Sequence, residues 1–167
     1  IIAVHSNEGT LFNGDSLKVI EELTKKSWTI PYSVRVDSLT NYSYVKSVND
    51  DLIVEPFIEE AEKKSIEFIE KRKDLVAGED IIYKSLISED KKTSVVSIIV
   101  DPPGPNKEDQ NSELINYVLG FIEPIKESNE NLDIRLLGNP YLDYISPRIV
   151  KAEMPVCLLY TSPSPRD

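Results

Sequence analysis

The side chains that could carry catalysis are few in this sequence. His5 is the single histidine among 167 residues, and Cys157 is the single cysteine. Without a second histidine, neither a histidine-based metal cluster nor a triad-like arrangement can be completed around His5. Adjacent carboxylates such as Asp50 and Asp51 point to opposite sides of a strand, so they make a poor acid–base pair. The sequence therefore predicts no catalytic residue, no metal site, no cofactor and no enzymatic activity.

Aromatic side chains are grouped between residues 28 and 44. They could line a path for a hydrophobic substrate, since such sites are largely apolar with few polar groups. Packing in and around the core is the alternative interpretation. The four residues are Trp28, Tyr32, Tyr42 and Tyr44.

Polar candidates stand in the same stretch. Arg35 and Asp37 are two residues apart and share one face of an expected strand, which indicates an ion pair or a contact with a partner. Thr40 and Asn41 follow in a turn, where their side chains can satisfy backbone groups by hydrogen bonding. A contact with a neighbouring domain is the second hypothesis for this turn.

Composition limits the function classes further. The chain is 40% hydrophobic and 29% charged, which is ordinary for a globular domain. Its formal net charge of −10 argues against a nucleic-acid partner and against electrostatic binding to anionic lipid surfaces. No apolar run approaches the roughly 20 residues that a membrane-spanning helix needs.

The hydrophobic pattern predicts strands and helices around one core. We expect strands at 1–5, 33–37, 94–100 and 134–137, with residues 86–87 forming a hairpin with 94–100. Amphipathic helices are expected between Asn13 and Pro31 and over residues 111–128. If residues 38–85 form an insert, this order is the split βαβ pattern of a ferredoxin-like sandwich, an α+β fold.

Two parts of the chain are harder to assign. Within the insert, residues 38–51 show no clear period, and a charged helix is expected over residues 58–73. The segment 141–156 could be helical, but Pro147 should interrupt it.

Three parts of the chain carry a family pattern: IPYSVRVDSLTNY (30–42) continued by DDLIVEP (50–56), then LISEDKKT (86–93), then IRLLGN (134–139). Together they resemble the periplasmic loop of exporters of the RND (resistance-nodulation-division) superfamily, in its MMPL-like and hydrophobe/amphiphile efflux branch. The sequence departs from the family in its second segment, where Lys91 or Lys92 replaces the usual glycine.

The resemblance implies a periplasmic porter domain over residues 1–156, placed between the first two transmembrane helices of a proton-driven transporter. The transporter would lie in a bacterial cytoplasmic membrane and export hydrophobic or amphiphilic, lipid-like molecules. The implied partners are the rest of the same chain, with its transmembrane helices and second porter loop, and further copies in a homo-oligomer. Residues 157–167 read as the translation of a sequencing adapter.

Other interpretations stay open. The chain could be a stand-alone ferredoxin-like module that binds a small molecule or regulates a partner. It could also be an enzyme on the same fold, or a protein-translocation accessory of the same superfamily. The aromatic and polar residues between 28 and 44 are candidates for a substrate path or an interdomain contact under the exporter hypothesis.

Overall fold

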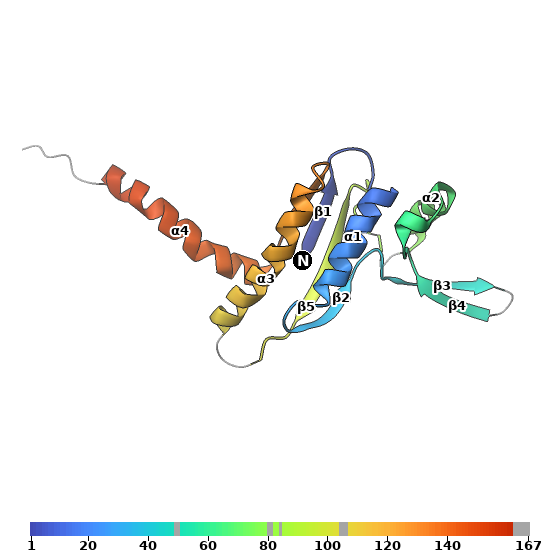
Figure 1. Cartoon of the computed structure of the whole chain (residues 1–167), viewed down its shortest axis with the longest axis horizontal. Coiled ribbons are helices and arrows are strands. Elements are labelled where there is room, and N and C mark those ends of the chain that lie inside the picture. Colours follow the sequence, from blue (N-terminus) through green and yellow to red (C-terminus); the bar gives the residue numbers. More distant parts are fainter. Residues whose placement is uncertain (49–50, 80–81, 84, 104–106, 162–167) are drawn as a thin grey trace, which may run out of the picture.

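The fold is known from a computed structural model, which describes residues 1–48, 51–79, 82–83, 85–103 and 107–161 (Figure 1). Within these residues the chain is a mixed α+β protein with a four-stranded antiparallel sheet and a separate two-stranded sheet. The strands are β1 (Ile2–Ser6), β2 (Ser33–Asp37), β3 (Ser43–Val48), β4 (Asp51–Pro56), β5 (Thr93–Val100) and β6 (Leu132–Leu136). The α-helices are α1 (Gly14–Ser27), α2 (Ile66–Leu75), α3 (Lys107–Glu127) and α4 (Asn139–Thr161).

The larger sheet has the strand order β2-β5-β1-β6. The central strand β1 pairs with β5 through Ile2 opposite Val96, and with β6 through Val4 opposite Ile134. Strand β2 completes the sheet by pairing with β5, with a register irregularity between Ser33 and Arg35. All of these pairings are antiparallel, so strands distant in the sequence become neighbours.

One face of this sheet carries the core. Alternate residues of the strands, such as Ile2, Val4 and Val96, are fully buried because successive side chains of a strand point to opposite faces. Helices α1 and α3 cover this face, as Figure 1 shows. The expected start of α1 is confirmed, because the side chain of Asn13 accepts a hydrogen bond from the backbone N–H of Ser16 at 2.8 Å.

The opposite face of the sheet is more polar and more exposed. On it, His5 Nδ1 lies 2.8 Å from Thr93 Oγ1, and Arg135 forms an ion pair with Asp133 at 2.6 Å. Ile99 is half exposed on the same side. The histidine therefore lies within hydrogen-bond distance of a neighbouring strand.

The segment between β2 and β5 forms a hairpin, α2 and two short 3-10 helices, one before α2 and one directly after it. Strand β3 falls in the stretch for which the sequence showed no period, and it pairs with β4 as a hairpin that projects from the body of the protein (Figure 1). The helix expected over 58–73 is wrong in its first half. Glu60 adopts a left-handed conformation with φ of 51°, and α2 begins only after Ser65, whose hydroxyl accepts from the N–H of Phe68.

Two further expectations need correction. The hairpin arm expected at 86–87 is reduced to isolated bridges, one of them between Ile87 and Ser94. Helix α4 is continuous through Pro147, which was expected to interrupt it. Near this proline the guanidinium of Arg148 donates to the carbonyl oxygen of Tyr144 at 2.6 Å.

No helix among the described residues combines the length and apolar character needed to cross a bilayer. The tail expected at 157–167 is helical up to Thr161, and residues 162–167 lie outside the described part.

Candidate functional site

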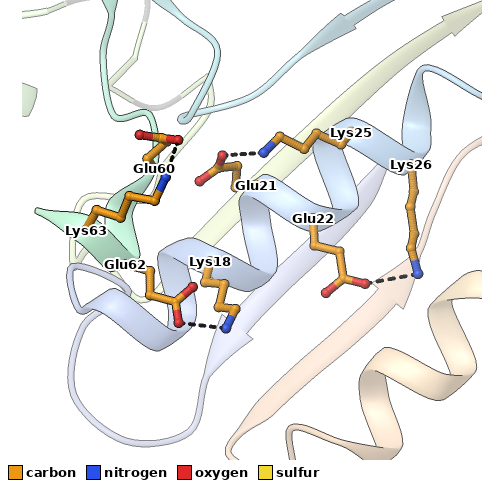
Figure 2. Close-up of a pocket in the computed structure, with 8 residues that line it drawn as sticks. All are labelled: Lys18, Glu21, Glu22, Lys25, Lys26, Glu60, Glu62 and Lys63. Carbon is orange, nitrogen blue, oxygen red and sulfur yellow. Dashed lines mark hydrogen bonds and ion pairs between the residues drawn. The ribbon is translucent and has the colours of Figure 1, made fainter.

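A charged cleft of about 450 Å³ lies between α1 and the segment that contains the 3-10 helix η1 (Ala61–Lys63). Figure 2 shows lysines and glutamates from both elements reaching into the same space. The lining residues are Lys18, Glu21, Glu22, Lys25, Lys26, Glu60, Glu62 and Lys63.

The charges in this cleft are matched in pairs. Two pairs lie within α1 at i,i+4 spacing, one lies within the η1 segment, and one joins the two elements. The distances are 2.6 Å for Lys25–Glu21, 3.0 Å for Lys26–Glu22, 2.7 Å for Lys63–Glu60 and 3.0 Å for Lys18–Glu62. Four positive and four negative charges cancel, so the cleft does not select a ligand by its charge.

Ion-pair partners shift the pKa of four of these groups. The hydrogen bond from Lys63 lowers the pKa of Glu60, and the same contact raises the pKa of Lys63. The carboxylates of Glu62 and Glu21 likewise raise the pKa of Lys18 and Lys25. These shifts move the groups away from neutral pH, whereas a general acid or base needs a pKa near it.

A smaller cleft of about 170 Å³ adjoins the charged one, since Glu21 and Lys25 line both. Three of the residues predicted from the sequence lie on its wall: Trp28 at the end of α1, and Thr40 and Asn41 in the turn after β2. Trp28 is 52% exposed, which leaves its ring available for contact with another molecule.

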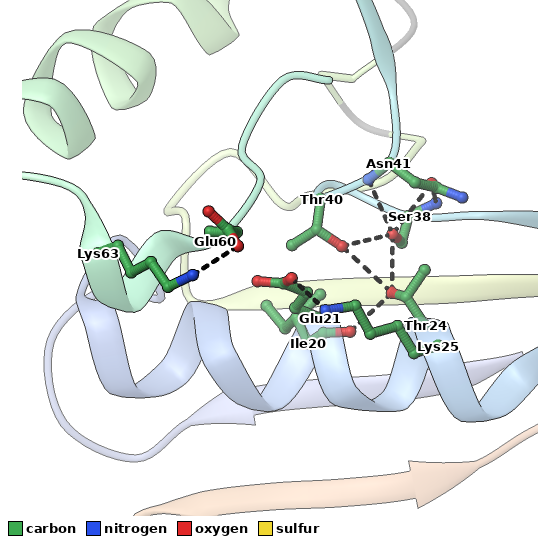
Figure 3. A network of polar contacts seen from close by, with 9 residues as sticks. All are labelled: Ile20, Glu21, Thr24, Lys25, Ser38, Thr40, Asn41, Glu60 and Lys63. Atoms are coloured by element: carbon green, nitrogen blue, oxygen red, sulfur yellow. Dashed lines mark hydrogen bonds and ion pairs between the residues drawn. The ribbon is translucent and has the colours of Figure 1, made fainter. Parts of the chain in front are cut away.

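Buried hydroxyls join this turn to α1, as Figure 3 shows. Thr24 Oγ1 lies 2.9 Å from Ser38 Oγ, and Ser38 Oγ lies 3.0 Å from Thr40 Oγ1. The hydroxyl of Thr24 also bonds to the carbonyl oxygen of Ile20 in its own helix. The three hydroxyls are almost fully buried, so their mutual hydrogen bonds offset the loss of water.

Asn41 fixes the conformation of the turn. Its Oδ1 accepts from the N–H of Ser38 at 2.7 Å, and its Nδ2 donates to the carbonyl oxygen of Val36 at 2.7 Å. The prediction that side chains of this turn satisfy backbone groups is confirmed for Asn41, whereas the hydroxyl of Thr40 contacts the hydroxyls of Ser38 and Thr24 instead. The second predicted role of Thr40 and Asn41, a contact with another domain, stays a prediction.

The other polar candidates lie elsewhere. Arg35 and Asp37 form the expected ion pair, with 2.8 Å between Arg35 Nε and Asp37 Oδ2. Both belong to β2 and flank the buried Val36, so they point to the face of the sheet opposite α1 and α3. The structure does not bring this pair into the cleft beside Trp28.

The aromatic residues that are close in sequence separate in space. Tyr32, with a left-handed φ of 64°, donates its hydroxyl hydrogen bond to Glu113 in α3 at 3.2 Å, and this bond raises the pKa of the phenol. Tyr42 and Tyr44 instead pack edge-on against Phe57, with centroid distances of 6.5 Å and 5.8 Å. The sequence group is therefore not one continuous aromatic surface.

Sequence reasoning missed the residue that organises the insert. Arg72 of α2 is nearly buried and lies over the rings of Tyr44 and Phe57, while its Nη2 binds Glu55 Oε1 at 2.5 Å. Lys46 binds the same carboxylate at 2.9 Å. An arginine in a charged helix gives no signal of burial by its type alone, because arginine is mostly exposed.

Within the described residues, no group of three histidine, cysteine, aspartate or glutamate side chains is arranged to hold a metal ion. The clefts offer shape, an exposed indole and paired charges. Comparisons of the chain with protein-family models, with curated proteins and with solved structures give no match.

Proposed function

We propose that this chain is the extracytoplasmic porter domain of a proton-driven exporter of the RND superfamily, MMPL-like branch, which moves hydrophobic or amphiphilic molecules across a bacterial cytoplasmic membrane. In this role the domain performs no covalent chemistry. It provides a surface along which a substrate passes, and contacts with the neighbouring domains of the same transporter.

The strand order carries the proposal. Along the chain, the main sheet takes β1 as its first strand, β2 as its second, β5 as its third and β6 as its fourth. With this numbering, the antiparallel order β2-β5-β1-β6 is that of a ferredoxin-like split βαβ sandwich. Helices α1 and α3 then occupy the two crossover positions on one face, as Figure 1 shows. We assign this fold to the chain, and it is the fold that the resemblance to the porter loop implies.

The hairpin motif supports the same assignment. In the resembling pattern a glycine stands where this sequence has Lys91 or Lys92. Lys91 has a φ of 59°, a left-handed conformation that glycine adopts more readily than other residues. The side chain of Asp90 accepts a hydrogen bond from the N–H of Lys92 and so supports the turn without glycine.

The projecting hairpin supplies a surface for a neighbouring domain. Val45 and Val54 face each other across the two strands and are 51% and 63% exposed, and Leu52 on the same face is 75% exposed. A two-stranded hairpin with an apolar exposed face is marginally stable by itself in water and gains from being covered. A second domain of the transporter is the occupant that the proposed function provides.

The two ends of the sheet domain also suit insertion between two helices. The backbone of Leu137 donates to the carbonyl oxygen of Ile1, so the entry to β1 lies beside the exit towards α4. A domain whose entry and exit are adjacent can be placed in a longer chain without distorting it.

Long-read sequencing of the native gene, prepared without adapters, tests the proposal. We expect an apolar stretch of roughly 20 residues upstream of Ile1 and a second one shortly after residue 156. Polar sequence on both sides would contradict the exporter and favour a stand-alone ferredoxin-like module that binds small molecules. If the gene has the expected spans, deletion of it should make the host retain a lipid-like substrate, and complementation should restore export.

A further inference from the structure

An apolar cavity of about 340 Å³ lies at the end of the sheet where the chain turns from β6 into α4. Its walls come from the ends of β5 and β6, from the inner side of α3 and from the first turn of α4. The lining residues are Ile1, Ile30, Ile98, Ile99, Val100, Leu114, Ile115, Val118, Leu136, Leu137, Gly138, Pro140 and Tyr141.

The chemistry of this lining is uniform. The side chains of these residues are all uncharged, although 29% of the residues in the chain are charged, and the α-ammonium group of Ile1 donates to the carbonyl oxygen of Leu137 at 3.1 Å. The phenol of Tyr141 is the one polar side chain among them. A cavity so poor in hydrogen-bonding groups holds water badly, because an enclosed water needs two to four polar partners.

The cavity has a buried floor and an open apolar mouth. Val118 and Ile115 are 1% and 2% exposed, whereas Ile1 and Leu137 are 47% and 50% exposed. Half-exposed aliphatic side chains around the mouth of a cavity lose contact with water when a ligand enters, which provides a driving force of about 25 cal/mol per Å² of apolar surface covered. This gradient from floor to rim fits a ligand that is apolar at one end.

Backbone N–H groups at the mouth of the cavity already donate hydrogen bonds within the protein. The N–H of Leu137 donates to Ile1, and the N–H groups of Tyr141 and Leu142 both donate to the carbonyl oxygen of Gly138. A peptide strand added at this place would need free backbone donors and acceptors in a row. These pairings therefore favour a ligand recognised by apolar contact over one recognised by strand pairing.

We propose that this cavity binds the alkyl tail of a small amphiphile. The tail would lie against Val118 and Ile115, and the polar head group would lie at the mouth beside Tyr141. The volume lies at the lower end of the range for small-molecule sites, which are mostly apolar with a few polar groups. The binding site is inferred from the cavity alone. That its ligand is also the exported molecule rests on the proposed function.

The test uses the full chain and dodecanoate, titrated by calorimetry below its micellar concentration. We expect saturable binding with one site, and similar binding of dodecyltrimethylammonium, because the head group lies in solvent. Butyrate, with the same head group and a short chain, should bind at least tenfold more weakly than dodecanoate, since each buried methylene contributes about 0.8 kcal/mol.

Two variants assign the binding to this cavity. Val118→Phe fills the floor, and Leu137→Lys places a charge at the exposed rim without disturbing the core. Val118→Phe should weaken the binding of both C12 ligands at least tenfold, and Leu137→Lys should weaken binding of dodecyltrimethylammonium at least tenfold because the two positive charges repel. Ile66→Lys, at an 82% exposed position on α2, should leave the binding of both ligands unchanged. If Val118→Phe fails to fold, as judged by circular dichroism, Leu137→Lys still decides the question.

Three outcomes would overturn the proposal: no saturable binding of either C12 ligand, dodecyltrimethylammonium binding that Leu137→Lys leaves intact, or a concentration-dependent dimer that Leu137→Lys dissociates. The last outcome would assign the rim to a protein interface. Failure of alkyl binding would not contradict the exporter proposal. Polar sequence encoded on both sides of this chain in the native gene would contradict the exporter, and the cavity would then be the ligand site of an independent module.

Discussion

The guanidinium carbon of Arg72 lies 4.7 Å from the centre of the Tyr44 ring, and this contact joins α2 to the projecting hairpin. The same guanidinium lies 5.3 Å from the ring of Phe57 and 5.0 Å from that of Phe68. Its carboxylate partner, Glu55, comes from the hairpin. One nearly buried cation therefore connects both strands of the hairpin, the segment after it and the helix that follows.

Replacing this arginine should loosen the insert. We expect Arg72→Ala to lower the free energy of unfolding by about 2 kcal/mol, because it removes the stacked cation and one ionic partner of Glu55. Arg72→Lys should recover only part of the loss, since an ammonium cannot stack as a planar group. The measurement is urea denaturation followed by tyrosine fluorescence.

The matched control is the adjacent Lys71, whose side chain is 73% exposed. Lys71→Ala should change the free energy of unfolding by less than about 0.5 kcal/mol. Equal effects of Arg72→Ala and Lys71→Ala would show that the ring contacts do not stabilise the insert.

Acid should weaken the same contact. Hydrogen bonds from Lys46, and then from Arg72, lower the pKa of Glu55 below its usual 4.5. The unfolded chain therefore binds a proton at higher pH than the folded chain does. The stability that this carboxylate contributes is complete above pH 4.5 and is lost as the pH falls through the lowered pKa.

Glu55→Gln removes this titration. Thermal unfolding between pH 7 and pH 3 should show a smaller loss of stability for Glu55→Gln than for the unchanged chain. Other carboxylates with lowered pKa values, such as Asp90 and Asp133, titrate in both proteins and provide the common background. Parallel curves for the two proteins would contradict the assignment.

The turn after β2 should depend on its amide. Asn41→Ala leaves the buried N–H of Ser38 and the carbonyl oxygen of Val36 without these side-chain partners, so we expect a loss of about 2 kcal/mol. Asn41→Asp keeps the acceptor for Ser38 but cannot donate to Val36, and its effect should be intermediate. Hydrogen exchange of the Ser38 amide reports the turn directly: it should accelerate in Asn41→Ala and stay slow in Asn41→Asp.

The charged cleft should contribute little to stability. Lys18 and Glu62 are joined across the cleft at 3.0 Å, but their side chains are 56% and 65% exposed. A double-mutant cycle with Lys18→Ala and Glu62→Ala should give a coupling energy below about 1 kcal/mol at low salt. A coupling well above that value, persisting in 1 M sodium chloride, would mean that the cleft is a rigid structural joint.

The strands of the main sheet could be predicted from the sequence, whereas the hairpin was harder. In β1 and β5, buried aliphatic residues alternate or run together, and this pattern depends on the core alone. In β3 the inward residues are Tyr44 and Lys46, which pack against Phe57 and pair with Glu55. A strand whose inner face is a tyrosine and a lysine gives no alternation of polar and apolar residues.

In the candidate site, hydrogen bonds between residues close in sequence could be predicted, whereas contacts between distant residues could not. The hydrogen bonds of Asn41 link it to residues within five positions, so the type of residue in a turn was enough to predict them. The separation of Tyr32 from Tyr42 depends on α3, which lies about 80 residues further along and supplies Glu113. Such contacts follow from the tertiary fold and not from spacing.

The central position of β1 has a consequence for how the protein is made. Residues 2–6 are synthesised before the other strands of the sheet, yet their partners are residues 93–96 on one side and 132–136 on the other. Loops of this length make pairing slow, and in a nascent chain one edge of β1 stays unpaired until β5 has emerged and the other until β6 has emerged. Ile2 and Val4 would meanwhile face water, so the growing chain should be a client for a chaperone until its last strand is available. Once β6 docks, its pairing and that of β5 cover both edges of β1 and complete the sheet.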